Sequence, residues 1–364
     1  MRPTPPRPRS RGARHKRTSG AAARTGDGQP RDRRRRHGSG RARRRLAALL
    51  GCLLLAGTGL GSWLAYDSLN DNLSTTDVTS RLGSDRPPRT AGKALNILLL
   101  GSDSRAGDNA AYGGHVDGAR SDTAMLVHLN GDHTAATVVS VPRDTVVHRP
   151  PCVRPDGTTA GPASAAMFNT AYAVAGSPCT VKTLESLSRI RVDHVVEVDF
   201  TGFKKLIDTI GGVEVKVPQD IHDPKSGLDL TRGEHRLDGE QALALVRTRY
   251  GIGDGSDLGR IRLQQLFLSA LAVQMKADHL LTNPVRLYRI ADAATSALTT
   301  DEELGSLKAL SSLAHDFADV APDAIDFHTL PVEPYPEDPN RVQPAEPAAT
   351  HLWNTIRRDG RGRG

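Results

Sequence analysis

Two aspartates lie next to apolar segments of this 364-residue chain, at positions where they could bind a divalent metal ion. Asp103 follows the run ALNILLLGS, and Asp122 directly precedes the run that begins at Thr123. Such runs predict buried strands, and open α/β sheets bind ligands beyond the ends of their strands. Two carboxylates from neighbouring strand ends could share one Mg²⁺, a hard cation that completes its shell with water and phosphate oxygens. The alternative is that both aspartates only cap turns.

Four arginines stand where predicted strands and helices begin or end: Arg143, Arg247, Arg249 and Arg260. A guanidinium group can donate two parallel hydrogen bonds to the oxygens of one phosphate, whereas a Lys ammonium acts as a point charge. We therefore predict that these four side chains surround an anion. The alternative is a solvated charged loop in which they form salt bridges with Asp254 and Asp257.

The elements that would position these side chains follow from the spacing of apolar residues. Strands are predicted at 94–100, 123–129, 135–141, 194–200, 213–217 and 324–330, with a hairpin turn at Asn130-Gly131. Helices are predicted at 202–210, from Asp238, at 257–277, from Pro284, at 304–317 behind a capping box of Thr300 and Glu303, and near 351–356. Because strands and helices interleave, we predict an α/β fold with a mixed central β-sheet flanked by helices (α/β/α).

The predicted helix after Asp257 is more apolar than one buried face requires. It reads LGRIRLQQLFLSALAV from 258 to 273. Such a helix could line a cavity for a lipid, with Leu266, Phe267 or Ala270 facing it near Arg249. The alternative is that these side chains form ordinary core.

Charge is distributed unevenly along the chain. The formal net charge is +7, but the first 45 residues contain 17 Lys and Arg against two Asp, which leaves the remainder near −8. The basic stretch lacks the apolar side chains needed to form a core, so we expect residues 1–45 to be disordered. A nucleic-acid-binding domain would carry its basic residues in the folded body, interleaved with aromatic ones, and aromatic residues make up only 4% of this chain. We therefore expect no nucleic-acid partner.

Residues 46–66, LAALLGCLLLAGTGLGSWLAY, are uncharged and long enough to cross a bilayer as a single helix. Arginines on the N-terminal side of this run, with Asp67 and Asp71 on the other side, predict a cytoplasmic N-terminus and an extracytoplasmic body. A cleaved signal peptide is one alternative, and acylation at Cys52 is another. We expect a stalk at 67–92, a folded domain at 93–356 and a flexible tail at 357–364.

Cys152 and Cys179 both lie in the predicted extracytoplasmic body. In an oxidising compartment such a pair predicts a disulfide. Their Pro-rich flanks indicate loops, and two free thiols are the alternative. The sequence contains no Ser nucleophile elbow, Walker loop or HExxH motif.

Seven ordered stretches of the chain resemble the LytR-CpsA-Psr family. They read NILLLGSDSR (96–105), RSDTAMLVHL (120–129), SVPRDT (140–145), FNTAYAVAG (168–176), DHVVEVDFTGFKKLIDTIGGVEVKVP (193–218), LDGEQALALVRTRYG (237–251) and DLGRIRLQQ (257–265). The similarity covers about residues 94–278 and continues more loosely to the end. The predicted membrane anchor and basic tail are also typical of this family.

The resemblance implies roles for individual residues. The residues that match the family's Mg²⁺-binding carboxylates are Asp103 and Asp122. Those that match its pyrophosphate-binding residues are Arg143, Arg247, Arg249 and Arg260, with Gln264 nearby and Arg120 added to the set. We expect Asp103, Asp122 and Arg143 to act in catalysis. The chain departs from the family pattern in a longer loop at 106–119, where contacts to an acceptor would lie.

The resemblance also implies an activity in cell-wall assembly. A Mg²⁺-dependent phosphotransferase would move a glycopolymer from a polyprenyl-pyrophosphate carrier to peptidoglycan and form a phosphodiester. Such a reaction needs positioning and electrostatic stabilisation more than covalent chemistry from the protein. Two alternatives are a pyrophosphatase that hydrolyses the same lipid and a non-catalytic regulator or scaffold of the envelope. The expected partners are the lipid-linked glycopolymer, peptidoglycan and the cytoplasmic membrane.

Overall fold

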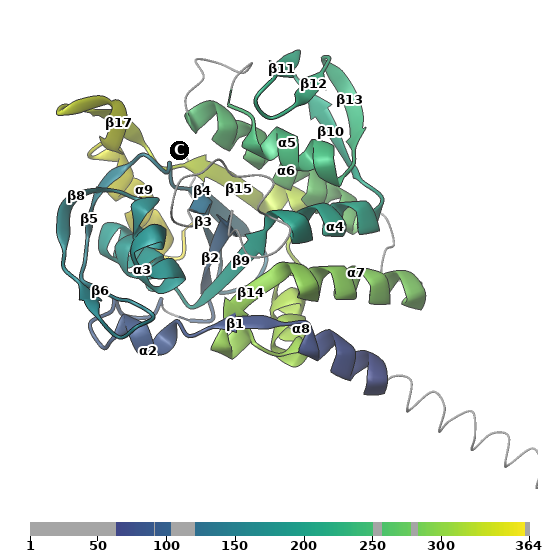
Figure 1. The fold of residues 1–364 in the computed structure, drawn as a ribbon, viewed down its shortest axis with the longest axis horizontal. Helices are drawn as coiled ribbons and strands as arrows, with labels where there is room; N and C mark the ends of the chain where they lie inside the picture. Colours follow the sequence, from purple (N-terminus) through teal and green to yellow (C-terminus); the bar gives the residue numbers. More distant parts are fainter. Residues whose placement is uncertain (1–62, 91, 103–120, 250–256, 278–282, 361–364) are drawn as a thin grey trace, which may run out of the picture. The chain divides into compact units, whose positions relative to one another are not determined.

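Strands from most of the length of the domain form one mixed sheet (Figure 1). The computed structural model describes residues 63–90, 92–102, 121–249, 257–277 and 283–360. Within them, the sheet has the strand order β1-β14-β9-β2-β3-β4-β15. The strand bounds are β1 Ser74–Thr76, β2 Leu95–Ser102, β3 Ser121–Leu129, β4 Ala136–Ser140, β9 His194–Asp199, β14 Leu298–Asp301 and β15 Ile325–Thr329. β3 pairs antiparallel with both β2 and β4. β9 pairs parallel with β2, and β15 pairs parallel with β4. The predicted mixed sheet is therefore confirmed.

The hairpin predicted at Asn130-Gly131 joins β3 to β4. The side-chain oxygen of Asn130 accepts hydrogen bonds from the backbone N–H of Thr134 at 2.8 Å and of Ala135 at 3.0 Å. Asn is favoured in turns because its short side chain satisfies backbone donors in this way. The turn therefore fixes the register of two central strands.

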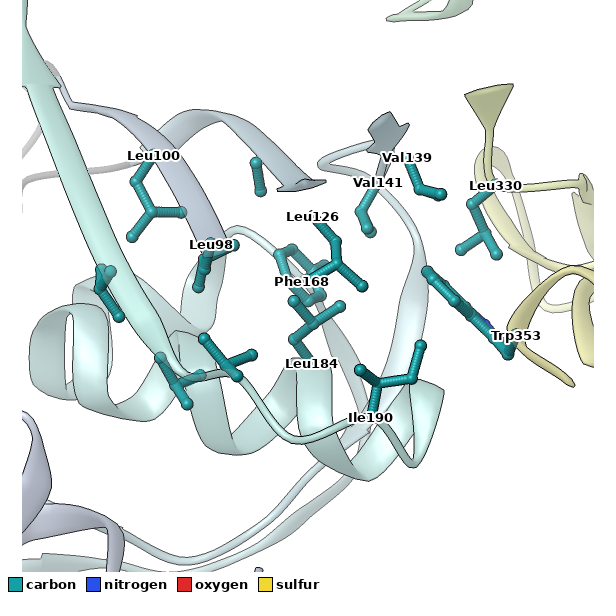
Figure 2. Close-up of a cluster of buried hydrophobic side chains, with 14 of the residues drawn as sticks. Leu98, Leu100, Leu126, Val139, Val141, Phe168, Leu184, Ile190, Leu330 and Trp353 are labelled. Carbon is teal, nitrogen blue, oxygen red and sulfur yellow. The ribbon is translucent and has the colours of Figure 1, made fainter. Parts of the chain in front are cut away.

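One face of the sheet packs against α3 (Thr170–Ser188) and α9 (Ala348–Arg357). Alternate residues of each strand point to this face, as the period of a strand requires. Figure 2 shows the side chains that meet there: Leu98, Leu100, Leu126, Val139, Val141, Phe168, Leu184, Ile190, Leu330 and Trp353. This cluster is the main core of the domain.

Helices also cover the opposite face of the sheet. α8 (Leu307–Asp316) packs there against β2, β3 and β9. A second group consists of α4 (Phe200–Ile210), α5 (Gly239–Arg247), α6 (Asp257–Ala277) and α7 (Pro284–Ala297), which share a core with β10 (Val213–Val217) and β13 (Gly233–Leu237). Figure 1 shows this group on one side of the sheet, with the hairpin of β11 (Ile221–Asp223) and β12 (Leu228–Leu230) beyond α5. Helices on both faces confirm the predicted α/β/α layers.

The remaining elements are short. They are α2 Thr79–Leu82, β5 Val146–Arg149, β6 Cys152–Val153, β7 Thr159–Ala160, β8 Ala163–Met167, β11 Ile221–Asp223, β12 Leu228–Leu230, η2 Glu302–Leu304, η3 Pro322–Ala324, β16 Val332–Tyr335 and β17 Asp338–Pro344. Except for α2, η2 and η3, they pair into two-stranded sheets outside the main sheet.

Side-chain caps explain where the helices of the second group begin. The Asp199 carboxylate accepts a hydrogen bond from the Gly202 N–H at 2.9 Å, and Asn283 Oδ1 accepts from the Val285 N–H at 3.0 Å. Asp238 and Gln241 form a capping box at α5, as predicted. A cap of this kind contributes about 1 kcal/mol to stability.

One predicted helix start is wrong. The sequence predicts a capping box of Thr300 and Glu303 before a helix at 304–317, but Thr300 belongs to β14. Asp301 instead caps η2, and Ser306 caps α8. β14 lies between β1 and β9, so pairing within the sheet overrides the local helix signal.

Both predicted boundaries of the folded domain need correction. The stretch at 67–92 is part of the packed domain rather than a stalk, because it contributes β1 and α2, and Val78 and Leu82 lie in the main core. At the other end, the first residues of the predicted tail at 357–364 pack against the domain. Asp359 Oδ1 lies 3.1 Å from His128 Nε2, and the Asp359 carboxylate accepts a hydrogen bond from the Gly131 N–H.

Of the helices in the described part of the chain, none is long and apolar enough to cross a membrane. The predicted basic tail and most of the predicted span at 46–66 lie outside the described residues, which begin at Trp63 in a helix over 63–71.

Cys152 and Cys179 form the predicted disulfide, with their Cα atoms 5.3 Å apart. Both cysteines are buried. The expectation that both lie in loops is wrong, because Cys152 is in β6 and Cys179 is inside α3. Pro178 is tolerated there because α3 is kinked at Ala175 and Gly176. The disulfide ties the β6–β7 hairpin to this helix.

Candidate functional site

The arginines predicted to surround an anion line one pocket, which we call the arginine pocket. Its volume is about 320 Å³. Its lining residues are Thr123, Arg143, Phe200, Asp223, Lys225, Ser226, Val246, Arg247, Arg249, Arg260 and Gln264. All four predicted arginines and the predicted glutamine therefore converge, although they come from segments far apart in the sequence.

Arg247 and Arg249 reach the pocket from the end of α5. The helix ends at Arg247 because Thr248 adopts an extended conformation with ψ of 131°. The hydroxyl oxygens of Thr248 and Ser226 are 2.7 Å apart, which links this turn to the β11–β12 hairpin. The guanidinium of Arg247 lies over the Phe200 ring, 4.9 Å from its centroid, in a cation–π contact.

Asp257, the first residue of α6, gathers three of the arginines. Its Oδ1 forms an ion pair with Arg260 Nη2 at 2.6 Å and accepts a hydrogen bond from Arg249 Nη2 at 3.2 Å. Its Oδ2 accepts from the backbone N–H of Arg143 at 3.1 Å, and Arg143 Nε is 3.8 Å from Oδ1. One carboxylate thus offsets part of a concentrated positive charge and holds the arginines together.

The alternative of a solvated loop is right in naming Asp257 as a salt-bridge partner of the arginines but wrong about solvation. The side chains of Asp257 and Arg260 are only 8% and 5% exposed, so their ion pair is buried. Asp254, the other expected partner, lies outside the described residues. The described lining of the pocket contains five cations, Arg143, Lys225, Arg247, Arg249 and Arg260, which outnumber the carboxylates of Asp144, Asp223 and Asp257 beside them, so the pocket suits an anionic ligand.

Arg260 and Gln264 lie one turn apart on α6, and both are buried. Gln264 Nε2 donates hydrogen bonds to Thr123 Oγ1 and to Val246 O, each at 2.9 Å. These bonds join α6 to the start of β3 and to the end of α5. Gln264 therefore positions three walls of the pocket.

Sequence reasoning missed the contribution of the β11–β12 hairpin, which brings Asp223, Lys225 and Ser226 to the pocket. Asp223 is buried, and its carboxylate accepts hydrogen bonds from the backbone N–H of Arg249 at 3.1 Å and of Lys225 at 3.0 Å. The signal in the sequence was the turn Asp223-Pro-Lys-Ser-Gly. A turn signal predicts the local bend but not the site that the bend faces.

The predicted metal site lies largely beyond the described residues. Asp103 and Arg120 fall outside them, and Asp122 is placed in β3 by its backbone only. The strand register pairs Gly101 with Thr123 and Ser102 with Ser121, so Asp122 stands opposite the end of β2, as expected. Elsewhere in the described residues, no group of three or more His, Cys, Asp or Glu could hold a metal ion. The Mg²⁺ site stays a prediction.

An apolar cavity of about 200 Å³ adjoins the arginine pocket. The two share Thr123, Phe200, Val246 and Gln264 as lining residues. The rest of the cavity is lined mainly by apolar side chains: Leu99, Leu100, Met125, Val198, Phe203, Leu206, Ile207, Leu243, Phe267, Leu268, Leu271 and Leu298, with Gly101. An apolar space that begins beside a group of cations fits a ligand with an anionic head and a hydrocarbon chain.

The predicted lining of a lipid cavity by α6 is confirmed in part. Phe267 lines the cavity, together with Leu268 and Leu271 of the same helix. Leu266 and Ala270 are instead half-buried and pack against the core shared by α4 to α7. The helix therefore serves both as core and as a cavity wall.

Comparisons with known proteins agree with this geometry. A family model described as "LytR_cpsA_psr family" matches residues 66–358. The cell wall biosynthesis protein LcpA of Corynebacterium glutamicum is 30% identical over 317 residues, which cover 79% of this chain and 60% of LcpA. TagV of Bacillus subtilis, named a polyisoprenyl-teichoic acid–peptidoglycan teichoic acid transferase, is 31% identical over 320 residues, which cover 85% of this chain and 76% of TagV.

A solved structure shows the same fold. The LytR-Csp2A-Psr enzyme from Actinomyces oris superposes with a TM-score of 0.59 at 25% identity, covering 78% of this chain and 95% of that one. The match to a whole solved domain means that the arginine pocket lies within a fold already known from an enzyme.

Proposed function

Because this chain belongs to the LytR_cpsA_psr family, we propose that it transfers a glycopolymer from a polyprenyl-pyrophosphate carrier to peptidoglycan and joins the two by a phosphodiester. The names of two relatives, the teichoic acid transferase TagV and the cell wall biosynthesis protein LcpA, support this activity. The observation that carries the proposal is the arginine pocket beside the apolar cavity. In a pyrophosphate attached to an isoprenoid chain, the charged pyrophosphate fits the arginine pocket and the apolar chain fits the cavity.

The reaction requires one bond to form and one to break. A hydroxyl oxygen of peptidoglycan attacks the phosphorus next to the glycan, and the bond from that phosphorus to the bridging oxygen breaks. Polyprenyl phosphate leaves with the electron pair, and the hydroxyl proton is lost. Negative charge grows on the leaving phosphate, where Arg247, Arg249 and Arg260 can donate hydrogen bonds that strengthen as the charge develops.

Arg143 and Arg120 would complete the binding of the pyrophosphate, and Gln264, whose Nε2 already donates to Thr123 and Val246, would position α6 beside them. Arg143 lines the arginine pocket, and Gln264 fixes α6 against β3 by its bond to Thr123. Arg120 directly precedes β3, so the chain enters the sheet close to Thr123 of the pocket lining.

We also propose that Asp103 and Asp122 hold a Mg²⁺ ion. The pairing of β3 with the end of β2 supports this, because Asp103 follows Ser102 and Asp122 follows Ser121 in neighbouring strands. Carboxylate oxygens are the protein ligands that Mg²⁺ favours. When bound, the ion would withdraw electrons from the phosphate oxygens and so assist the attack.

The domain would act outside the cytoplasm, attached to the cell membrane. The uncharged run at 46–66 and the arginines on its N-terminal side support a single span with a cytoplasmic N-terminus. An extracytoplasmic position brings the domain to the peptidoglycan acceptor.

A transfer assay tests the proposal. The full chain in detergent would be given a polyprenyl-pyrophosphate-linked glycan and peptidoglycan oligomers, and products would be identified by mass spectrometry. The expected product is an oligomer that carries the glycan through a phosphodiester. Equal release of glycan phosphate with and without acceptor would instead identify a pyrophosphatase, and absence of turnover would leave a binding or scaffold role.

Single substitutions test whether the activity depends on the residues of the arginine pocket and of the proposed metal site. Arg249→Lys should lower turnover on the order of ten- to a hundredfold, because an ammonium cannot replace the planar fork. Asp122→Asn should abolish Mg²⁺-dependent turnover. Arg232→Lys is the matched control, since Arg232 is exposed and does not line the pocket. Equal activity of Arg249→Lys and Arg232→Lys would contradict the proposed role of the pocket.

A further inference from the structure

The turn between β11 and β12 is held firmly at the outer rim of the arginine pocket. The Asp223 carboxylate accepts hydrogen bonds from the backbone N–H of Lys225 at 3.0 Å and of Arg249 at 3.1 Å. The Gly227 N–H donates to Asp223 O at 2.9 Å, and Gly227 has a φ of 75°, which glycine adopts without strain. The turn is therefore fixed to the end of α5 before any ligand binds, which lowers the entropy cost of binding.

The arginine pocket has two ends, one beside the apolar cavity and one beside this turn. Four residues line both the pocket and the cavity and so mark the inner end: Thr123, Phe200, Val246 and Gln264. Lys225 and Ser226 of the turn line the pocket but not the cavity. Figure 1 shows the β11–β12 hairpin beyond α5 from the central sheet, whose strands β2, β3 and β9 help to line the cavity. The turn therefore marks the outer end of the pocket.

These two ends set the direction of the lipid-linked donor in the pocket. The hydrocarbon chain of the donor needs the apolar cavity, so the phosphate attached to that chain lies at the inner end. Arg247 belongs to this end, because its guanidinium lies 4.9 Å from the centroid of the Phe200 ring. The second phosphate and the first sugar then lie toward the turn, where the exposed Lys225 borders the solvent. A long glycopolymer leaves the pocket on this side.

The hydrogen bonds around Ser226 decide what this side chain can bind. The Thr248 hydroxyl donates its single proton to Ala244 O at 2.8 Å. Ser226 Oγ lies 2.7 Å from Thr248 Oγ1 and 3.3 Å from Asp223 O, so the proton of the Ser226 hydroxyl is directed to one of these two oxygens. Ser226 Oγ therefore keeps lone pairs that accept but has no further proton to donate. Ionised phosphate oxygens only accept, whereas a sugar hydroxyl also donates, so Ser226 suits a sugar.

We propose that the β11–β12 turn recognises the first sugar of the donor, and that Ser226 Oγ accepts a hydrogen bond from one hydroxyl group of that sugar. The inference rests on the proposed function, because a glycan-linked lipid pyrophosphate is the ligand that brings a sugar to the outer end. The arginines bind the pyrophosphate of any such lipid. Ser226 adds specificity, since a sugar whose hydroxyl groups point elsewhere leaves this oxygen without a donor and binds less tightly.

Binding calorimetry with the full chain in detergent tests the inference. The reference probe is farnesyl pyrophosphate capped by a methyl group, which has the charge of a sugar-linked pyrophosphate but no sugar. The other probes carry a single glucose, galactose, N-acetylglucosamine or N-acetylgalactosamine in place of the methyl group. Ser296→Ala is the matched control for Ser226→Ala. Ser296 Oγ donates to a backbone carbonyl, Asp292 O, at 2.7 Å, and Ser296 lines neither the pocket nor the cavity.

The unaltered chain should bind at least one sugar-linked lipid more tightly than the methyl-capped one. Ser226→Ala should weaken the binding of that lipid about two- to tenfold, the contribution of one hydrogen bond, and leave the affinity for the methyl-capped lipid unchanged. Ser296→Ala should change neither affinity. A turn that is merely loosened by Ser226→Ala would instead shift Arg249 and weaken the binding of both lipids.

Three results would overturn the inference: equal weakening of both lipids in Ser226→Ala, no weakening of either, or an unaltered chain that prefers no sugar-linked lipid to the methyl-capped one. In each of these cases, binding of the methyl-capped lipid by the unaltered chain leaves the proposed function standing. An unaltered chain that binds none of the probes would overturn the proposed function together with the inference.

Discussion

Replacing Asp257 by Asn tests whether the arginine pocket is built to receive an anion. The substitution is nearly isosteric and removes only the charge that faces Arg143, Arg249 and Arg260. The Asp257 oxygens lie 2.6 Å from Arg260 Nη2 and 3.2 Å from Arg249 Nη2, and the Asp257 side chain is 8% exposed. The variant therefore leaves the buried guanidinium of Arg260 and the partly exposed one of Arg249 without this counter-charge.

The magnitude follows from the burial of this ion pair. Removing one partner of a buried pair costs about 3–5 kcal/mol, and Asn keeps part of the hydrogen bonding, so we expect a loss of about 3 kcal/mol. In a domain of this size 1 kcal/mol corresponds to roughly 2 °C, so the Tm should fall by about 6 °C. Asp229→Asn is the matched control, because the Asp229 side chain is 79% exposed and its pair with His222 should contribute little.

An anion in the pocket should reverse much of the loss. Inorganic pyrophosphate supplies the charge that Asp257→Asn lacks, so at constant ionic strength it should raise the Tm of this variant more than that of the unaltered chain. Calorimetry with and without pyrophosphate measures both effects. The reasoning is refuted if Asp257→Asn melts like the unaltered chain, or if pyrophosphate raises the Tm of Asp257→Asn no more than that of Asp229→Asn.

Three further predictions concern stability and topology. Replacing both Cys152 and Cys179 by Ala should lower the free energy of unfolding by between about 3 and 4 kcal/mol, and a reductant should destabilise only the unaltered chain in denaturant titrations. Burial by itself lowers the pKa of His194, but the hydrogen bond and charge of Asp301 outweigh it and raise that pKa above its ordinary value of 6.5. The stabilisation is therefore present at acidic pH and lost as pH rises through the raised pKa, so the stability advantage over His194→Gln should shrink as pH rises above 6.5. A reporter fused after Gly364 should be active only outside the cytoplasm, and activity inside would contradict the proposed topology.

Much of the fold could be predicted because its signals are local. The central strands are short apolar runs, and α5 and α7 begin at Asp238 and at Pro284 after Asn283, as expected. The arginines were found for a similar reason, since Arg247, Arg249 and Arg260 stand at helix ends next to the turn that the sequence marks. The family resemblance then supplied their common ligand.

The parts that escaped prediction depend on contacts between distant segments. Thr300 has a good local helix signal, yet β14 pairs with β1 and β9, which lie over a hundred residues away in the sequence. Lys225 and Ser226 belong to a polar turn, and only the folded chain brings that turn to Arg249. Val78 and Leu82 are isolated apolar residues in a polar stretch, and their burial depends on the core that α3 forms with the sheet.

Transfer to peptidoglycan, rather than hydrolysis, is tested most directly by following solvent oxygen. The full chain would turn over the lipid-linked glycan with peptidoglycan oligomers in water enriched in a heavy oxygen isotope. Attack by a peptidoglycan hydroxyl predicts a phosphodiester product whose mass contains no oxygen from the solvent. Glycan phosphate or polyprenyl phosphate that carries one heavy oxygen per turnover, without linked product, would contradict the proposed transfer.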